Sequence, residues 1–159
     1  NVAHSLIQGA AKVGMHLRIA TPAGYAPDPA VLAAAARDAA RSSTQVTLLT
    51  DPAEAAAGAH VLYTDVWTSM GQEAERSARR AIFAPYHLGA HLLRLAAPDA
   101  IVLHPLPAHR GEEISDEVLD GPRSRAFVQA ENRLHVQKAI LHALLASEVR
   151  GRARVAVSA

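Results

Sequence analysis

The sequence contains no cysteine among its 159 residues. Disulfide bonds and thiolate metal sites are therefore excluded. A chain that needs no disulfide suits a reducing compartment, so the cytoplasm is the predicted location.

Long apolar runs and an excess of charge of one sign are also missing. No stretch of about 18 uninterrupted apolar residues appears in the sequence, and its first residues lack the basic-then-apolar layout of a secretory signal. Sixteen basic residues stand against fifteen acidic ones, for a formal charge of +1. The sequence therefore gives no reason to expect a nucleic acid or a membrane as the partner, and it predicts a small-molecule ligand.

Half of the residues are apolar, which is enough for one domain with a proper core. Short, continuous apolar runs alternate with helical patterns. Because continuous runs indicate strands covered on both faces, we expect a doubly wound, Rossmann-like α/β fold with a parallel sheet. The expected strands are 15–21, 45–50, 60–65, 100–104 and 125–129, and the expected helices are 2–13, 29–42, 52–58, 72–96 with a break at Pro85, 112–119 and 133–149.

The two ends of the chain differ from a standard doubly wound fold. The chain opens on Asn1, a good helix N-cap, and so begins with a helix where such folds usually begin with a strand. We therefore expect the sheet to lack its first strand. The last residues have charge and small side chains without helical period, so a frayed tail is expected over 147–159.

Three polar strings follow predicted strands: DVWTSMGQE, HPLPAHRGEE and AENR. Because ligands of open parallel sheets bind at the carboxyl ends of strands, the three strings should meet at one edge. Asp65 offers a carboxylate and Ser69 a hydroxyl beside a helix start with free N–H groups, a pairing that suits an amino acid. The alternative is that Asp65 caps the next helix and that Trp67 and Met70 are core residues.

The prolines of HPLPAHR fix two φ angles and remove two N–H donors. The loop carbonyls then become stiff acceptors for a substrate N–H. The peptide bond before Pro107 can be cis or trans, and the sequence does not decide between them. His104 and His109 are weak metal candidates, because no HExxH motif, cysteine or third ligand at a recognisable spacing accompanies them. We therefore predict no metal site.

Charged residues follow this loop and open the last helix. Arg110 with Glu112 or Glu113 fits a solvated helix start. Arg133 lies where a guanidinium can reach a carbonyl or phosphate oxygen. The alternative for Arg133 is an ordinary surface ion pair with Glu131.

Five segments together resemble the second, ornithine-binding domain of ornithine carbamoyltransferase. They are NVAHSL, ATPAGYAPD, DPAEAAAGAHVLYTDVWTSMGQE, HPLPAHRGEEISDEVLDGPRS and AENRLHVQKAIL, in family-like order over residues 1–146. DVWTSMGQE and LPAHRGEEI distinguish the chain from aspartate and other transcarbamylases. The resemblance implies transfer of a carbamoyl group from carbamoyl phosphate to the δ-amine of ornithine, giving citrulline and phosphate in arginine biosynthesis.

The same resemblance implies roles for individual residues. Those that bind the ammonium and carboxylate groups of ornithine are Asn1, Asp65, Ser69 and the backbone of Met70. Those on the carbamoyl phosphate side are Pro105, Leu106 and Arg133. The catalytic positions are His104 and Pro105. No cofactor or metal is implied, because the chemistry rests on orientation of a neutral amine and electrostatic support of a tetrahedral centre.

The implied partners are ornithine, carbamoyl phosphate, the family's first domain and further copies in a homotrimer. That first domain, with its Ser-x-Arg-Thr-Arg phosphate loop, is absent from this sequence, so the chain alone is expected to be inactive. Its last helix should then expose an apolar stripe and promote self-association. Ornithine enzymes usually carry HCLP where this chain has HPLP, so weaker ornithine binding is expected from Pro105.

Two other classes of function stay open. A non-catalytic amino-acid-binding or regulatory module would keep DVWTSMG and tolerate loss of the phosphate loop. A dinucleotide-binding oxidoreductase shares the predicted fold, but no GxGxxG motif follows a predicted strand, which disfavours it.

Overall fold

The structure, a computed structural model, describes residues 1–68 and 75–157. Helices and strands alternate along the chain as predicted. In order they are α1 (Val2–Val13), β1 (Leu17–Ala20), α2 (Pro29–Ala40), β2 (Val46–Leu49), α3 (Pro52–Ala56), β3 (Val61–Tyr63), α4 (Arg76–Phe83), η2 (Ala84–Tyr86), α5 (Ala90–Leu95), β4 (Ile101–Leu103), α6 (Asp116–Leu119) and α7 (Ala126–Val157).

Two helices begin with the same Asp-Pro signal. The N-cap carboxylate of Asp28 accepts the Ala30 N–H at 2.7 Å, and that of Asp51 accepts the Ala53 N–H at 2.8 Å. The proline that follows each cap has the φ angle of a helix and no N–H to leave unpaired. These caps explain why α2 and α3 begin where the sequence predicts.

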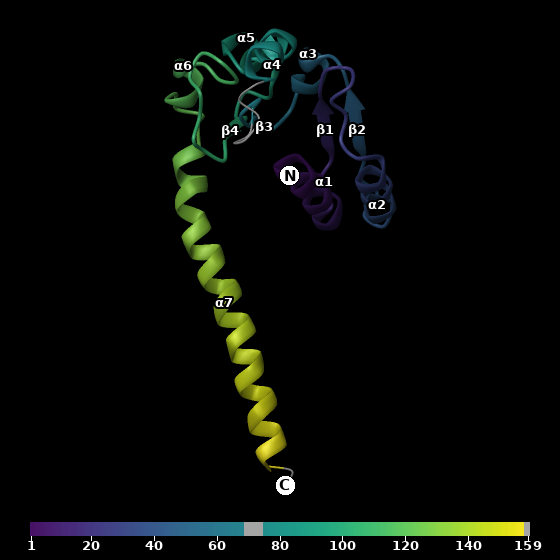
Figure 1. Ribbon diagram of the computed structural model, residues 1–159, viewed down its shortest axis with the longest axis vertical. Coiled ribbons are helices and arrows are strands. Elements are labelled where there is room, and N and C mark those ends of the chain that lie inside the picture. The colour runs from purple at the N-terminus through teal and green to yellow at the C-terminus, as the bar shows by residue number, and fades with distance from the viewer. Residues whose placement is uncertain (69–74, 158–159) are drawn as a thin grey trace.

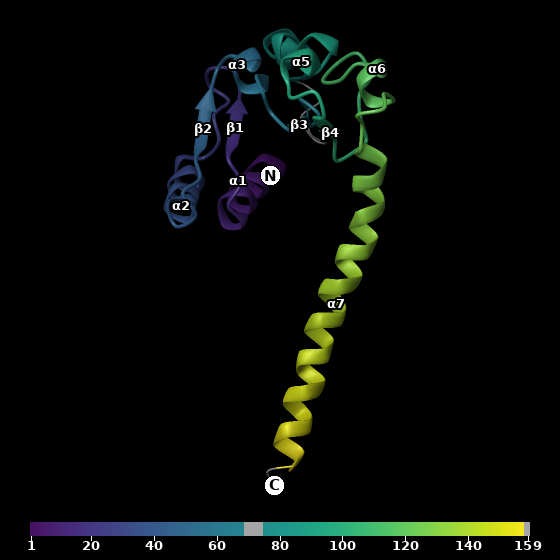
Figure 2. The ribbon, with the colours of Figure 1, turned by 180° about the vertical axis from the view of Figure 1, so that it is seen from behind.

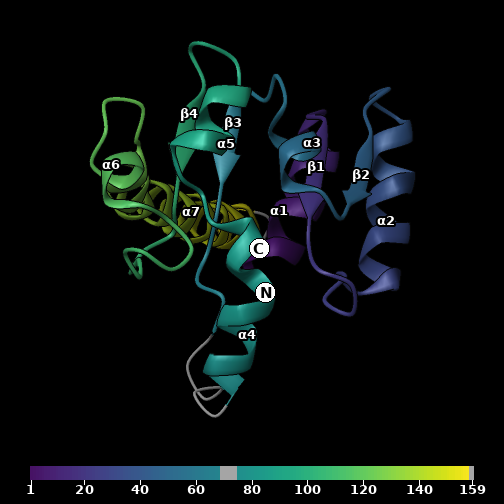
Figure 3. The ribbon, with the colours of Figure 1, turned by 90° about the horizontal axis from the view of Figure 1, so that it is seen from above.

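The strands form two parallel pairs. β1 pairs with β2 in a register that sets Leu17 opposite Val46, and β3 pairs with β4 with Val61 opposite Ile101. Among the described residues no ladder joins β1 to β3, so the strands form two separate pairs. In Figure 3, α3 and α5 lie in front of the strands and α1 and α7 behind them, which confirms the doubly wound α/β class.

The predicted strand at 125–129 is wrong, because α7 begins at Ala126. Before it, the backbone pairs with β4 only through one parallel bridge, between Ser124 and Val102. The Ser124 hydroxyl then accepts the Ala126 N–H at 3.4 Å and starts the helix. A short apolar segment such as AFV cannot be assigned to strand or helix by periodicity alone.

Two helix boundaries also differ from the prediction. The helix predicted over 112–119 forms only as α6, because the chain first makes a turn in which Gly111, at φ +77°, donates its N–H to Ile114 O at 2.9 Å. The last helix begins at Ala126 instead of residue 133 and continues to Val157 instead of residue 149.

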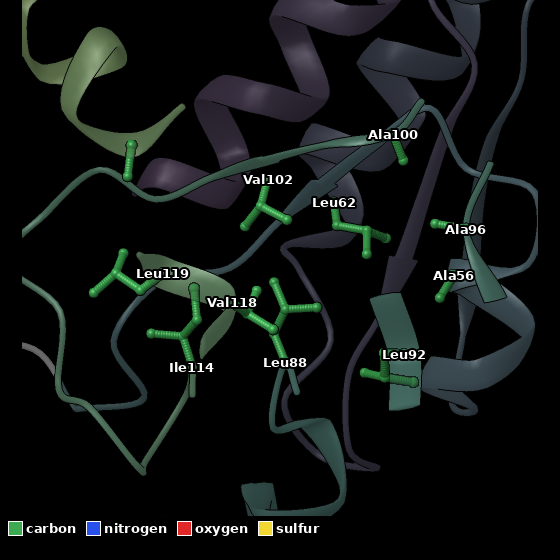
Figure 4. Close-up of a cluster of buried hydrophobic side chains, with 11 residues drawn as sticks. Ala56, Leu62, Leu88, Leu92, Ala96, Ala100, Val102, Ile114, Val118 and Leu119 are labelled. Carbon is green, nitrogen blue, oxygen red and sulfur yellow. The ribbon is translucent and has the colours of Figure 1, made fainter. Parts of the chain in front are cut away.

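Two clusters of buried apolar side chains hold the elements together. The larger one joins α3, β3, α5, β4, α6 and the start of α7 (Figure 4), and its members are Ala56, Leu62, Leu88, Leu92, Ala96, Ala100, Val102, Ile114, Val118, Leu119 and Ala126. The smaller one, between α1 and α2, comprises Ile7, Ala11, Ala35 and Ala39. Since each fully buried large aliphatic side chain contributes about 1.5–3 kcal/mol, the larger cluster anchors the β3–β4 pair.

α7 projects from the body as one long helix (Figures 1 and 2). Large apolar side chains that are more than half exposed line it: Phe127, Val128, Leu134, Val136, Ile140, Leu141, Leu144 and Leu145. The exposed apolar stripe predicted for the last helix is therefore present. Of the helices that the structure describes, none combines the length and hydropathy needed to cross a bilayer.

Candidate functional site

The strings that begin at Asp65 and His104 follow β3 and β4 as predicted, whereas AENR lies within α7, so the prediction that it follows a strand is wrong. In Figure 3 the arrows of β2 and β3 point toward the side on which α4 lies. β4 is parallel to β3, and the bridge between Val102 and Ser124 is parallel too. The segments after Tyr63, Leu103 and Ser124 therefore run in the same direction.

Asp65 follows β3, and its Oδ1 accepts the Val66 N–H at 2.8 Å. The next described α-helix is α4, whose N-cap is Glu75, so the capping alternative for Asp65 is wrong for that helix. Oδ2 of Asp65 makes no hydrogen bond to another described residue. Ser69 and Met70 lie outside the described residues, and their contacts with an amino acid stay predictions.

An aromatic cluster, not foreseen from the sequence, holds the segment after β3 against α4. The Phe83 ring contacts Tyr25 edge to face, with 4.9 Å between the ring centroids. It stacks on Trp67, with the centroids 6.1 Å apart, and lies tilted against Tyr86, with the centroids 5.9 Å apart. The Arg79 guanidinium lies 5.3 Å from the Tyr25 centroid. Four of the chain's six aromatic residues gather here, one Trp, two of three Tyr and one of two Phe. The small number of aromatic residues could have drawn attention to them. Their contacts could not be predicted, because Tyr25, Trp67 and Phe83 lie far apart in the sequence.

The His104 side chain fixes the proline loop, residues 104–107, from its buried side. This side chain is 0% exposed, and its Nδ1 accepts the Leu106 N–H at 2.9 Å. Nδ1 is therefore unprotonated, and the ring proton is on Nε2. Leu106 has φ +53°, and the peptide bond before Pro107 is cis.

Glu113 is the buried partner of His104. Its side chain is also 0% exposed, and its Oε1 accepts from His104 Nε2 at 3.2 Å and from the His109 backbone N–H. Burial raises the pKa of the Glu113 carboxyl, but the hydrogen bonds from His104 and from the backbone of His109 and Glu113 outweigh it, so this pKa lies below its ordinary value. The interpretation of Glu113 as part of a solvated helix start is wrong.

The outer side of the proline loop faces the beginning of α7 across a concavity of about 630 Å³. Its lining residues are Pro105, Leu106, Pro107, Ala130, Arg133, Leu134 and Gln137. The structure thus brings together Pro105, Leu106 and Arg133, which the family resemblance assigned to the carbamoyl side. His104 does not belong to the lining, because it lies behind the loop.

Donors and acceptors border this concavity. Arg133 is the one charged residue of the lining, and it makes no hydrogen bond or ion pair with another described residue. The surface ion pair with Glu131 is wrong, since Glu131 Oε1 lies 3.7 Å from His135 Nε2 instead. In the described part of the chain nothing donates to the carbonyls of residues 105–107.

Asn1 occupies the N-cap position of α1, but its side chain makes no capping hydrogen bond. Neither Asn1 nor Asp65 lines the concavity. Asn1 and Asp65, which are predicted to bind the amino acid, therefore lie outside the concavity that the residues predicted for the carbamoyl group line.

Comparisons with known proteins cover nearly the whole chain. Residues 1–144 match the family described as aspartate/ornithine carbamoyltransferase, Asp/Orn binding domain. The chain is similar to ornithine carbamoyltransferase from Gloeobacter violaceus, with 63% identity over 145 residues, which are 91% of this chain and 46% of that protein.

Solved structures show the same similarity. The crystal structure of ornithine carbamoyltransferase from Gloeobacter violaceus has a TM-score of 0.83 at 58% identity and is matched over 91% of this chain and 47% of its own. The structure of that from Pyrococcus furiosus has a TM-score of 0.85 at 51% identity, over 89% of this chain and 45% of its own. The chain spans about half the length of the relatives it matches.

Proposed function

The chain belongs to the aspartate/ornithine carbamoyltransferase family, and we propose that it supplies the ornithine-binding half of an ornithine carbamoyltransferase site. The reaction transfers the carbamoyl group of carbamoyl phosphate to the δ-amine of ornithine and yields citrulline and phosphate. We propose ornithine instead of aspartate as the substrate for two reasons. The similar proteins are named ornithine carbamoyltransferase, and the segment DVWTSMGQE resembles that of ornithine enzymes.

The juxtaposition of Pro105, Leu106 and Arg133 around one concavity carries this proposal. A carbamoyl group has one carbonyl oxygen that accepts and N–H groups that donate. Arg133 can donate to that oxygen, and the rigid loop carbonyls can accept from the carbamoyl N–H and from the attacking amine. The two walls of the concavity therefore complement the two sides of the carbamoyl group.

The chemistry follows from orientation and charge. The neutral δ-amine attacks the carbamoyl carbon while the loop carbonyls hold its N–H groups and so direct its lone pair. Negative charge grows on the carbamoyl oxygen, and the hydrogen bond from Arg133 strengthens with it. The tetrahedral centre then expels phosphate, which takes the proton that the amine loses, so no enzyme nucleophile is required.

His104 acts as a positioning residue in this scheme. It is buried behind the loop and does not border the concavity, so it holds Leu106 and has no contact with substrate. Pro105 and Leu106 are the loop residues placed against the reacting groups.

The ornithine ammonium and carboxylate are assigned to Asn1, Asp65, Ser69 and the backbone of Met70. For Asp65 the support is an oxygen that makes no hydrogen bond to another described residue. For Asn1 the support is a side chain that is not used in capping.

The phosphate group needs partners beyond this chain. Of the residues that line the concavity, only Arg133 carries a positive charge. Because the relatives are about twice as long as the matched region, we assign phosphate binding to another domain, with a neighbouring subunit of a trimer completing the site. Turnover by the chain alone is not expected, and the complete enzyme is assigned to the cytoplasm.

Ornithine binding can be measured through Trp67, the only tryptophan, which lies close to Asp65 in the sequence. L-ornithine should change its fluorescence in a saturable way, and L-aspartate should not. Asp65→Asn should weaken this response at least about tenfold, because a charge-assisted hydrogen bond is lost, whereas the exposed control Asp99→Asn should not. Preference for aspartate, or an unchanged response in Asp65→Asn, would contradict the assignment.

The mass of the native polypeptide tests the half-site. A mass about double the 16.8 kDa of this chain, with citrulline-forming activity, supports the transferase. A polypeptide of 16.8 kDa that binds ornithine without turnover favours a non-catalytic amino-acid-binding module instead.

A further inference from the structure

A second group of ligand-type side chains lies beside the proline loop. His109, Glu112 and Glu113 each place one donor atom within 4.8 Å of the other two. A tight turn gathers them, in which the Glu112 N–H donates to His109 O at 3.0 Å and Gly111 adopts φ +77°. None of the three borders the concavity assigned to the carbamoyl group.

An unsatisfied oxygen of Glu113 points independently to a ligand. The side chain is 0% exposed and its Oε1 is fully engaged, but Oε2 has no hydrogen-bond partner among the described residues. His109 Nδ1 lies 3.8 Å from Oε2, too far for a hydrogen bond. A buried carboxylate oxygen without a partner raises the free energy of the fold. A cation between Oε2 and His109 would remove that penalty.

The surrounding charge permits a divalent cation. Glu112 and Glu113 bring two carboxylates, of which Glu112 is paired with Arg76 at 2.7 Å and approached by Arg80 at 4.0 Å. Both arginine side chains are at least half exposed and can turn toward water, but the Glu112 side chain is only 13% exposed, so the bound ion must replace these ion pairs at Glu112. The neighbouring Arg110 is engaged elsewhere, with two other carboxylates.

The donor atoms must move closer together to share one ion. In a tetrahedral site, ligand bonds of about 2.0–2.2 Å place two ligands roughly 3.3–3.6 Å apart, so donor atoms as far as 4.8 Å apart must approach by about 1 Å. The His109 side chain is 43% exposed and can turn toward the two carboxylates. One imidazole nitrogen with two carboxylates is a donor set of first-row divalent ions, unlike the all-oxygen sets of Mg²⁺ and Ca²⁺.

In contrast to the prediction of no metal site made from the sequence, we propose that His109, Glu112 and Glu113 bind a divalent first-row transition-metal ion of the Zn²⁺ class, with water completing its coordination. Glu113 also holds His104 through its other oxygen. Ion binding is thereby coupled to the position of the proline loop. The site stands independently of the proposed reaction.

Co²⁺ is the probe, because its visible d–d absorption reports the number and type of ligands, and Zn²⁺ is the competitor. The chain is used without a histidine tag. One equivalent of Co²⁺ should bind and be displaced by Zn²⁺, and His109→Ala should weaken binding at least about tenfold. The matched control is His135→Ala, which removes a histidine 3.7 Å from Glu131 at a place where the described residues supply no third ligand, and it should leave binding unchanged.

Glu112→Gln gives a second test, since it removes one charge and keeps the side chain's size. It should also weaken Co²⁺ binding at least about tenfold, with circular dichroism confirming that each variant is folded. Absence of a Co²⁺ spectrum at one equivalent would overturn the site. Equal losses in His109→Ala and His135→Ala, or undiminished binding in either ligand variant, would overturn it as well.

Discussion

His104 stands at the centre of three hydrogen-bonded groups that shape the proline loop. Its ring accepts from the Leu106 N–H and donates to Glu113, which only one tautomer can do. Glu113 in turn receives the His109 N–H. The positions of residues 105 and 106 therefore depend on a carboxylate that lies beyond the loop in the sequence.

Glu113→Gln should destabilise the chain. The amide keeps one oxygen for His104, but it removes the charge and sets an NH₂ group in a buried place where the described residues offer no acceptor. We expect a loss of about 1–3 kcal/mol in the free energy of unfolding, measured by urea denaturation. The exposed control Glu117→Gln should stay within about 0.5 kcal/mol, and an equal loss in both variants would contradict the role given to Glu113.

Pro105→Cys should tighten ornithine binding. Proline at this position has no N–H and no polar side chain, whereas the family pattern carries a thiol that can contact ornithine. One added hydrogen bond of about 0.5–1.5 kcal/mol corresponds to roughly two- to tenfold in affinity, measurable by Trp67 fluorescence. The control is Pro98→Cys, at an exposed position before β4. A Pro105→Cys chain that bound ornithine no better would count against the prediction.

At the scale of elements, α4 is attached to the rest of the chain by rings more than by aliphatic burial. It has no buried residue, but Phe83 at its end contacts Tyr25, Trp67 and Tyr86. The segment that carries Asp65 is therefore tied to α4 through Trp67.

Phe83→Ala should loosen this attachment. Removing a half-buried ring with three aromatic neighbours should cost about 1–2 kcal/mol of unfolding free energy, and it should shift the emission of Trp67. The matched control is Ile82→Ala on the same helix, whose side chain is 41% exposed. If Ile82→Ala altered Trp67 emission as much as Phe83→Ala, the cluster would not be the attachment.

Tyr63 connects β3 to α7, because Gln129 Nε2 donates to its hydroxyl oxygen at 3.0 Å. Burial raises the pKa of Tyr63, and the negative charge of Asp65 raises it further. The hydrogen bond from Gln129 lowers it, but the pKa remains above its ordinary value. The stability from this group is present below the unfolded pKa, about 10, and is lost as pH rises through the folded pKa. Above about pH 10 the unfolding free energy should therefore fall more steeply for the unsubstituted chain than for Tyr63→Phe; equal slopes would contradict this.

For the whole molecule, the projecting α7 is the dominant feature (Figure 1). Its large apolar side chains are exposed along most of the described length. Such a surface favours association with whatever apolar surface is available, including another copy of the chain.

The isolated chain should therefore self-associate. Sedimentation velocity should show species that grow with concentration, and a Leu134→Lys, Leu141→Lys double variant should shift the population toward monomer. His142→Lys, an exposed change without loss of an apolar side chain, is the control. A clean monomer with a sharp cooperative melt would refute the prediction.

Sequence patterns predicted what depends on neighbouring residues. Continuous apolar runs located β1 to β4, Asp-Pro caps begin α2 and α3, and motif order identified the family. The error at 125–129 arose because a short apolar run fits both a strand and a helix. The meeting of Pro105 and Leu106 with Arg133 was expected through family resemblance, since no local pattern gives the distance between a loop and a helix.

By itself, the sequence determined the alternation of elements, the doubly wound class and the edge at which the polar strings lie, because these follow from local hydrophobic pattern, capping and strand direction. Only the tertiary structure decided that Glu113 is buried against His104, that four aromatic rings gather at α4, and that His109, Glu112 and Glu113 converge. Burial and coordination depend on which side chains, distant in the sequence, come into contact. Tertiary packing decides those contacts, and the spacing of residues along the sequence does not.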